Sequence, residues 1–283
     1  MNRLSVQRES QVIAALVEGN SIRATCRMTG VAKNTVVKLL VDLGAACSDY
    51  QDRRLRNLTC RRIQCDEIWS FCYAKERNVP ENLRGLDGYG DAWTWTGIDA
   101  DTKIAVSWLV GQRDGEYAKQ FINDLASRLA HIVQLTTDGH KPYLEAVEGA
   151  FGADIDYAML IKLYGEAPGS EKRYSPAQCI GSETRVIAGQ PDQKHVSTSY
   201  IERQNLTMRM GMRRLTRLTN AFSKKVENLA AAVSLHFMNY NFARPHMTLS
   251  KPYPTTPAMA AGLEDHVWSI AEIVELLNSS DSN

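Results

Sequence analysis

The chain has 283 residues, of which 44% are hydrophobic and 23% are charged, and its formal net charge is +1. This composition is ordinary for a globular protein with a sizeable core. No run of 18 apolar residues is present, and the first residues lack the apolar segment of a signal peptide, which argues against membrane and secreted classes. We therefore expect a soluble, cytoplasmic protein.

The charge is unevenly distributed along the chain. Residues 1–65 carry 11 basic and 5 acidic side chains, residues 66–165 carry 9 and 16, and residues 166–283 carry 13 and 11. An acidic centre between basic flanks suits a cation-binding site with edges that bind a polyanion. Solvated surface charge produces the same asymmetry, so this pattern needs support from specific residues.

The six cysteines indicate neither a disulfide framework nor a zinc site. They include no CxxC pair, and an intracellular chain of this length does not depend on disulfides. Cys60, Cys65 and Cys72 lack a fourth ligand at close spacing. We predict reduced, mostly buried thiols and no zinc.

Three helices are predicted at the N-terminus, in a helix-turn-helix arrangement. Apolar residues recur at helical spacing up to Val17, Gly19 ends this first helix, and Ser21 can cap the second. Gly30 then turns the chain into a third helix, whose first turns would present four polar residues to the major groove of DNA: Lys33, Asn34, Thr35 and Lys38. We predict a DNA-binding domain over residues 1–46 and a basic linker over 47–61. A plain three-helix bundle with a solvated polar face is the alternative.

From residue 62 the pattern changes from helical to extended. Strands are expected in "RIQCDEIWSFCY", "AWTWTGIDA", "KIAVSWLVG", "HIVQLTTDGH" and "IDYAMLIKLYG", and helices over 115–130 and 142–152. A polar loop over 166–197 leads to a further helix.

Three antiparallel strands followed by alternating strands and helices is the order found in ribonuclease H. The predicted fold class is therefore α/β: a ribonuclease H-like mixed five-stranded sheet with flanking helices over residues 62–257, preceded by the small all-α helix-turn-helix domain. A C-terminal helical tail is expected over 258–283.

Three carboxylates are candidates for one site. Asp66 lies inside an apolar strand, where an acid is costly unless it is paired or bound to metal, and Asp138 ends the fourth predicted strand. Adjacent strands could bring these two side chains together, and Glu202 begins the next helix. A site of hard oxygen ligands without a histidine suits Mg²⁺ or Mn²⁺.

Two such ions, roughly 3.5 to 4 Å apart, can activate a water or a 3′ hydroxyl and stabilise the oxygen that leaves phosphorus. Each acid also has a structural interpretation: Asp66 could pair with an arginine, Asp138 could form a turn with Gly139, and Glu202 could be an acid favoured by the helix dipole. The competing acids are Glu67, expected on the opposite face of its strand, and Asp99 and Asp101, expected in a turn.

The segment Tyr200–Lys225 carries one acid, Glu202, followed by seven bases. On one continuous helix Glu202 would share a face with Arg209, Arg213 and Arg217, and we predict that a nucleic-acid backbone follows this basic face. The other predicted DNA contacts of the segment are Arg203, Arg214, Lys224 and Lys225. The apolar residues of the segment are predicted to contact the core: Leu206, Met210, Leu218 and Phe222. A solvated charged face is the alternative, which the absence of balancing acids at i,i+4 disfavours.

The stretches "CDEIWSF", "TTDG", "YIERQNLTMRMGMRRLTRLTNAFSK" and "HFMNYNFARPH" together resemble the DDE transposases of the bacterial insertion-sequence-one family, over roughly Arg62 to Thr256. The resemblance implies a ribonuclease H-like catalytic domain, two divalent ions, and cleavage and strand transfer at terminal inverted repeats. By motif match it implies that Asp66, Asp138 and Glu202 form the DDE triad and that Arg209 is the basic residue seven positions after the glutamate. The chain departs from the family in having no cysteine zinc finger before the helix-turn-helix.

The sequence therefore predicts a magnesium-dependent bacterial DNA transposase associated with the nucleoid. Its expected partners are double-stranded DNA, as transposon ends and target, and further copies of itself, because two ends must be cut and joined in concert. Two other functions stay open at this point. One is a non-catalytic relic or repressor that binds DNA, and the other is a ribonuclease H-like nuclease or junction resolvase.

Overall fold

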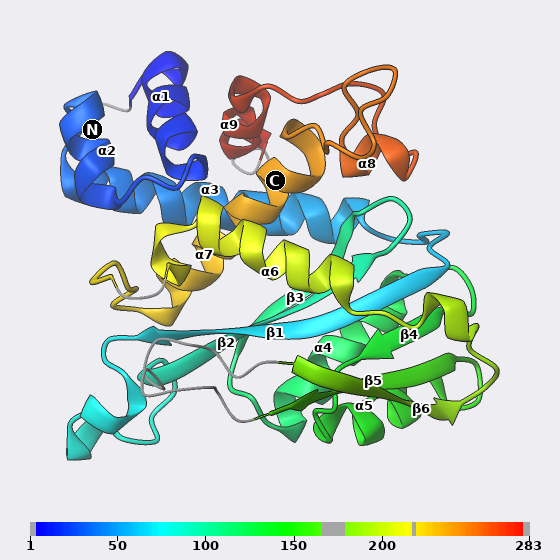
Figure 1. Ribbon diagram of the computed structural model, residues 1–283. Coiled ribbons are helices and arrows are strands. Elements are labelled where there is room, and N and C mark those ends of the chain that lie inside the picture. The colour runs from blue at the N-terminus through cyan, green and yellow to red at the C-terminus, as the bar shows by residue number, and fades with distance from the viewer. Residues whose placement is uncertain (1–3, 166–178, 217–218, 280–283) are drawn as a thin grey trace.

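The protein is built around a six-stranded sheet in the order β3-β2-β1-β4-β5-β6 (Figure 1). The computed structural model describes residues 4–165, 179–216 and 219–279. The strands are β1 (Arg62–Cys72), β2 (Gly90–Asp99), β3 (Ala105–Gly111), β4 (Gln134–Thr137), β5 (Asp156–Tyr164) and β6 (Cys179–Ala188). The first three strands pair antiparallel, β4 runs parallel to β1, and β5 runs parallel to β4. The predicted mixed sheet is found, with its five predicted strands in the expected chain order and a sixth strand added at one edge.

The sixth strand corrects the prediction of a polar loop over 166–197. β6 pairs antiparallel with β5 at the edge of the sheet. Nearly all of its residues are exposed, so it lacks the alternation of apolar and polar side chains that marks a half-buried strand. The part of that predicted loop at 166–178 lies outside the described residues.

Helices cover both faces of the sheet (Figure 1). One face carries α4 (Gly115–Arg128) and α5 (Pro142–Phe151), which pack with Phe121 and Leu125 buried. The other carries α6 (Ser199–Gly211) and α7 (Val226–Met238), whose Met208 and Phe237 pack against strand residues such as Ile68. Beyond α7 lie further helices, α1 (Val6–Val17), α2 (Ile22–Thr29), α3 (Lys33–Arg54) and α9 (Ile270–Ser279) (Figure 1).

The N-terminal helices are α1 (Val6–Val17), α2 (Ile22–Thr29) and α3 (Lys33–Arg54), and the first turns agree with the prediction. The Ser21 hydroxyl accepts a hydrogen bond from the backbone N–H of Ala24 at 3.1 Å, and Gly30 ends α2 at a φ of 68°, a conformation that favours glycine.

The third helix is longer than the sequence predicts, because it continues through residues 47–54, where a linker is expected. Cys47, Gln51 and Leu55 recur at a spacing of four and are fully buried, so the buried stripe of the helix extends through this polar stretch. Arginines and aspartates on the other faces of the helix make this stretch polar overall, so the buried stripe was not recognised from the sequence. The division into domains stays a prediction, although residues of α1, α3 and the sheet belong to one continuous apolar core.

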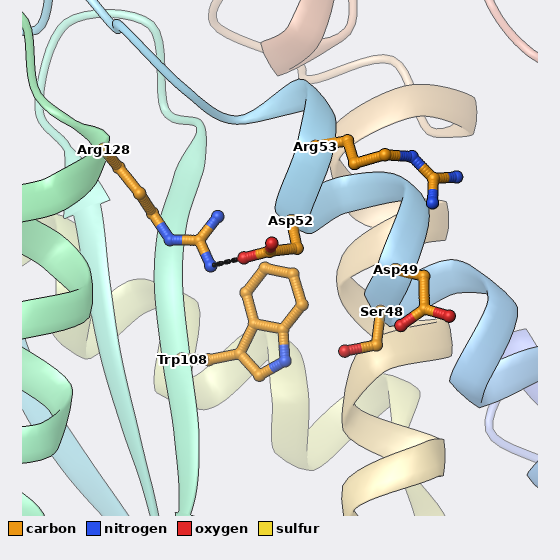
Figure 2. Close-up of a pocket in the computed structure, with 6 residues that line it drawn as sticks. All are labelled: Ser48, Asp49, Asp52, Arg53, Trp108 and Arg128. Atoms are coloured by element: carbon orange, nitrogen blue, oxygen red, sulfur yellow. Dashed lines mark hydrogen bonds and ion pairs between the residues drawn. The ribbon is translucent and has the colours of Figure 1, made fainter.

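The end of α3 is joined to the sheet layer by ion pairs around a pocket of about 290 Å³ (Figure 2). Arg128 of α4 donates to Asp52 of α3 at 2.8 Å and to Asp124 of its own helix at 2.7 Å. Trp108 of β3 forms a wall of this pocket. Because Arg128 and Asp52 neutralise each other, we interpret the pocket as a structural joint between α3 and α4.

The C-terminal part packs back onto the N-terminal helices. It contains the π-helical turn Asn239–Ala243, α8 (Pro257–Ala260) and α9 (Ile270–Ser279), besides the short 3-10 turns Glu76–Asn78, Glu81–Leu83, Gln193–His195 and Arg213–Leu215 elsewhere in the chain. Tyr50 of α3 contacts the rings of Phe242 and Trp268. None of the described helices has the length and apolar character needed to cross a bilayer.

Candidate metal centre

The sheet register brings Asp66 and Asp138 to the same level. The last parallel pair between β1 and β4 is Gln64 with Thr136, and each aspartate lies two residues further along its own chain. Residues two apart in a strand point to the same face, so the two carboxylates emerge side by side. The register thus explains how residues 72 positions apart in sequence meet.

A third carboxylate in this cluster is Glu67, contrary to the expectation that it faces away. One oxygen each of Asp66, Glu67 and Asp138 lie within 4.8 Å of one another. The strand β4 ends at Thr137, before the level of Glu67. Because no β4 backbone lies beside Glu67, its side chain can approach Asp66 and Asp138 although it starts on the other face of β1. The Glu67 side chain is completely enclosed and accepts a hydrogen bond from Arg113 Nε at 3.2 Å.

Arg113 is a cation that the sequence gives no reason to place here. Its Nη2 lies 3.6 Å from an oxygen of Asp138, so it bridges Glu67 and Asp138, and its guanidinium lies over the ring of Trp93. It follows β3 directly, in the connection to α4. Arg113 therefore compensates part of the negative charge of the cluster.

The docking of α6 on β1 brings Glu202 to the same site. The buried Gln64 side chain accepts hydrogen bonds from the backbone N–H groups of Tyr200 and Ile201, at 2.9 and 3.2 Å. One turn later, Asn205 donates to Asp66 Oδ2 at 2.8 Å. Gln64 and Asn205 thus hold the face of α6 that carries Glu202 against the strand that carries Asp66, and neither was identified from the sequence.

The Glu202 carboxylate is engaged by a lysine. Its Oε1 accepts from Lys162 of β5 and from Thr198. The group of mutually close ligand atoms contains Asp66, Glu67 and Asp138 but not Glu202. All three predicted acids nevertheless line one cleft of about 650 Å³, together with Arg113 and Lys162.

Asp99 and Asp101 take no part in this cleft. Asp99 Oδ2 accepts hydrogen bonds from the backbone N–H and the hydroxyl of Thr102, as expected of a turn residue, and Asp101 pairs with Arg62. The interpretation of both as turn acids is confirmed.

Burial and mutual repulsion raise the proton affinity of the cluster. Burial, followed by the charge of Asp138, raises the pKa of Asp66 to about 6 and that of Glu67 to about 7, while Arg113 opposes both shifts. Carboxylates that remain uncompensated in this way, with oxygens converging from two strands, fit a hard divalent cation such as Mg²⁺. Asp66, Glu67 and Asp138, whose oxygens converge, could hold such an ion.

The raised pKa of Asp66 predicts how the metal-free protein responds to pH. The folded state holds this proton more tightly than the unfolded chain, so stability from this group is present below pH 4 and is lost as pH rises from about 4 to 6. In EDTA, Asp66→Asn is expected to raise the free energy of unfolding by about 2 kcal/mol at pH 8. The gain should shrink towards pH 5. Urea titrations at both pH values measure it.

The asparagine keeps the size of the aspartate, and Asn205 can rotate its amide to accept a hydrogen bond from the new NH₂ group. The exposed Asp154→Asn serves as the control and is expected to change stability by less than about 0.5 kcal/mol. A destabilised Asp66→Asn at pH 8 would show that the Asp66 charge is already compensated. Adding Mg²⁺ is expected to stabilise the wild type and not the variant.

The predicted DNA-binding residues fall into an exposed group and a group with internal contacts. Exposed side chains are Lys33, Asn34, Thr35 and Lys38 at the start of α3, and Arg203, Arg213, Lys224 and Lys225. Arg209 donates to the Leu215 carbonyl at 3.4 Å and Arg214 to the Ser223 hydroxyl at 2.6 Å. Lys38 pairs with Asp42, and Arg217 lies outside the described residues.

The single basic face predicted for this segment is wrong, because α6 ends at Gly211. Met212 is extended, with φ −124° and ψ 104°, and a short 3-10 turn follows. Arg213 therefore leaves the face that carries Glu202. Of the predicted core contacts, Leu206 and Met210 are 45% and 70% exposed, whereas Phe222 is half-buried against the ring of Phe71. Leu218 lies outside the described residues.

Comparison with known proteins gives distant structural likenesses only. No family model and no curated protein matches the chain. A cryo-EM structure of a piggyBac transposase synaptic complex with hairpin DNA matches with 8% identity and a TM-score of 0.40, covering 98% of this chain and 72% of that one. A Mos1 transposase paired-end complex matches with 12% identity over 56% of this chain and 60% of that one (TM-score 0.23), and a Mos1 strand transfer complex with 9% over 85% and 78% (TM-score 0.26).

These scores are too low to support an argument about function. The chain is similar to transposases at low identity, and the narrower resemblance to the insertion-sequence-one family belongs to the proposal that follows.

Proposed function

We propose that this protein is a DNA transposase of the insertion-sequence-one type, which binds the terminal inverted repeats of its element and performs divalent-metal-dependent cleavage and strand transfer. The observation that carries the proposal is the convergence of Asp66, Asp138 and Glu202 on one cleft, from two register-matched strands and a helix anchored to one of them. Gln64 and Asn205 hold this arrangement with hydrogen bonds that a chance cluster of surface acids would not require.

In this proposal the two Mg²⁺ ions supply activation of the attacking oxygen and stabilisation of the leaving oxygen at phosphorus. The sheet register fixes the positions of the Asp66 and Asp138 carboxylates, and Glu202 supplies the third carboxylate from α6. Arg113, which touches Glu67 and Asp138, keeps the Asp138 side chain oriented. Lys162 is well placed to contact a DNA phosphate that enters the cleft.

Lys162 competes with metal for Glu202, which leads to a testable result. Lys162→Gln removes the cation that engages Glu202, so we expect Mn²⁺ to bind roughly tenfold more tightly, measured by calorimetry without DNA. The same variant is expected to bind duplex DNA more weakly. Lys141→Gln is the matched control, because it removes the same charge from the same cleft without breaking a contact to Glu202. Unchanged Mn²⁺ affinity in Lys162→Gln would contradict the competition.

The proposed activity is tested with a labelled duplex that ends in the terminal repeat of the element, incubated with Mg²⁺ or with EDTA. Wild-type protein is expected to nick the repeat end only with Mg²⁺, and Glu202→Gln is expected not to nick it. Tight duplex binding without nicking in either condition would instead indicate a DNA-binding relic or repressor. Metal-dependent nicking without joining to target DNA would indicate a nuclease.

A further inference from the structure

The outer edge of β6 is the longest open strand edge in the described part of the chain. β6 spans ten residues and has a strand neighbour on one side only, β5. Its apolar residues Ile180, Val186 and Ile187 are 70%, 48% and 38% exposed. An edge of this length with exposed apolar side chains is a template for pairing with another strand.

The central part of this edge lacks most features that discourage such pairing. The pairing with β5 is regular from Gly181 to Val186, with register shifts only beyond both ends. The segment contains no proline and no lysine. Its two charges, Glu183 and Arg185, lie on the same face of the strand, 3.3 Å apart. Whether a second strand can pair here therefore depends on what it places opposite these two charges.

A second copy of β6 meets this requirement in one register. A two-fold axis perpendicular to the sheet makes the strands antiparallel and keeps each side chain on its own face, so opposing residues are separated by an even number of positions. Centred on Glu183 or on Arg185, the pairing would place like charges opposite each other. Centred on Thr184, it places Glu183 of each copy opposite Arg185 of the other, and opposite charges in this position are favourable.

We propose that the protein forms a two-fold dimer through antiparallel pairing of β6 with β6 of a second copy, centred on Thr184. The two six-stranded sheets then join into one. In this register Val186 lies opposite Ser182, and Ile187 lies opposite Gly181, so each exposed apolar side chain gains a neighbour with room beside it. The proposal goes beyond the proposed function and does not rest on it, because the interface requires neither metal nor DNA.

Charge exchange tests the register. Sedimentation velocity without DNA is expected to show a dimer for the wild type, and Glu183→Arg or Arg185→Glu alone is expected to weaken it at least about tenfold, because each places two like-charge pairs at the interface. The double variant Glu183→Arg/Arg185→Glu restores opposite charges and is expected to recover the dimer. Thermal melts check that the single variants are folded.

Cross-linking tests the axis directly. In a Cys179→Ser background, Thr184→Cys is expected to form a disulfide-linked dimer on mild oxidation, since directly opposing side chains have Cβ atoms about 5 Å apart. Ser182→Cys is the matched control and is expected not to cross-link, because Ser182 of one copy faces Val186 of the other. A monomeric wild type, a dimer indifferent to both single charge variants, or equal cross-linking at both positions would overturn the proposal.

Discussion

Asp138→Asn is expected to reduce metal-dependent nicking about a thousandfold or more while duplex binding stays close to that of the wild type. The residue supplies one of the two carboxylates that the sheet register brings together, whereas the exposed basic side chains lie on other elements. In the proposed function Asp138 is a direct metal ligand, so we expect its loss to reduce activity by more than the ten- to hundredfold typical of residues that support a ligand. Nicking with Mg²⁺ and duplex binding in EDTA measure the two effects separately.

Glu67→Gln is the informative comparison, because Glu67 belongs to the same carboxylate cluster. Its enclosed side chain is bonded to Arg113, and glutamine keeps an oxygen for that bond. We therefore expect only about a tenfold reduction, as for a residue that orients a ligand. Complete loss in Glu67→Gln with activity retained in Glu202→Gln would mean that the metal is held by Asp66, Glu67 and Asp138 instead of the proposed triad. Equal loss of DNA binding in Asp138→Asn would contradict the separation of roles.

Gly44→Ala is expected to lower the free energy of unfolding by about 2–3 kcal/mol, although alanine is the better helix former. A Cβ at Gly44 would lie 2.6 Å from the Cα, Cβ and carbonyl oxygen of Ala231, where α3 crosses α7. Backbone atoms cannot move aside as the end of a flexible side chain can, so the two helices must separate. Urea unfolding monitored by circular dichroism measures the change.

Gly149→Ala in α5 is the matched control, because a Cβ there meets nothing within 4 Å. We expect this exchange to stabilise the protein by about 0.5–1 kcal/mol. If Gly44→Ala were neutral or stabilising, the close contact between α3 and α7 would be incorrect. The N-terminal helices would then be less firmly attached to the helices that cover the sheet than the packing indicates.

Local signals in the sequence predicted most elements correctly. Ser21 and Gly30 bound α2 through capping, which depends only on neighbouring residues. Asp66 stood out as an acid within an apolar strand. The predictions failed where charged residues hid the buried face of a helix, or where residue spacing suggested a helix longer than the one observed. The buried stripe of α3 runs on beneath charged residues, and the basic spacing after Glu202 suggested a helix that Gly211 ends.

The sequence by itself determined the order of the first five strands and of the helices between them, and the three acids of the candidate site, because periodicity, caps and isolated buried charges are encoded by neighbouring residues. Only the tertiary structure decided which groups surround those acids. Glu67, Arg113, Lys162, Gln64 and Asn205 reach the site from different elements, through a strand that stops early, a connecting segment and the docking of a helix. Such contacts depend on the packing of distant segments, and so does the open edge of β6, which no pattern within its ten residues revealed.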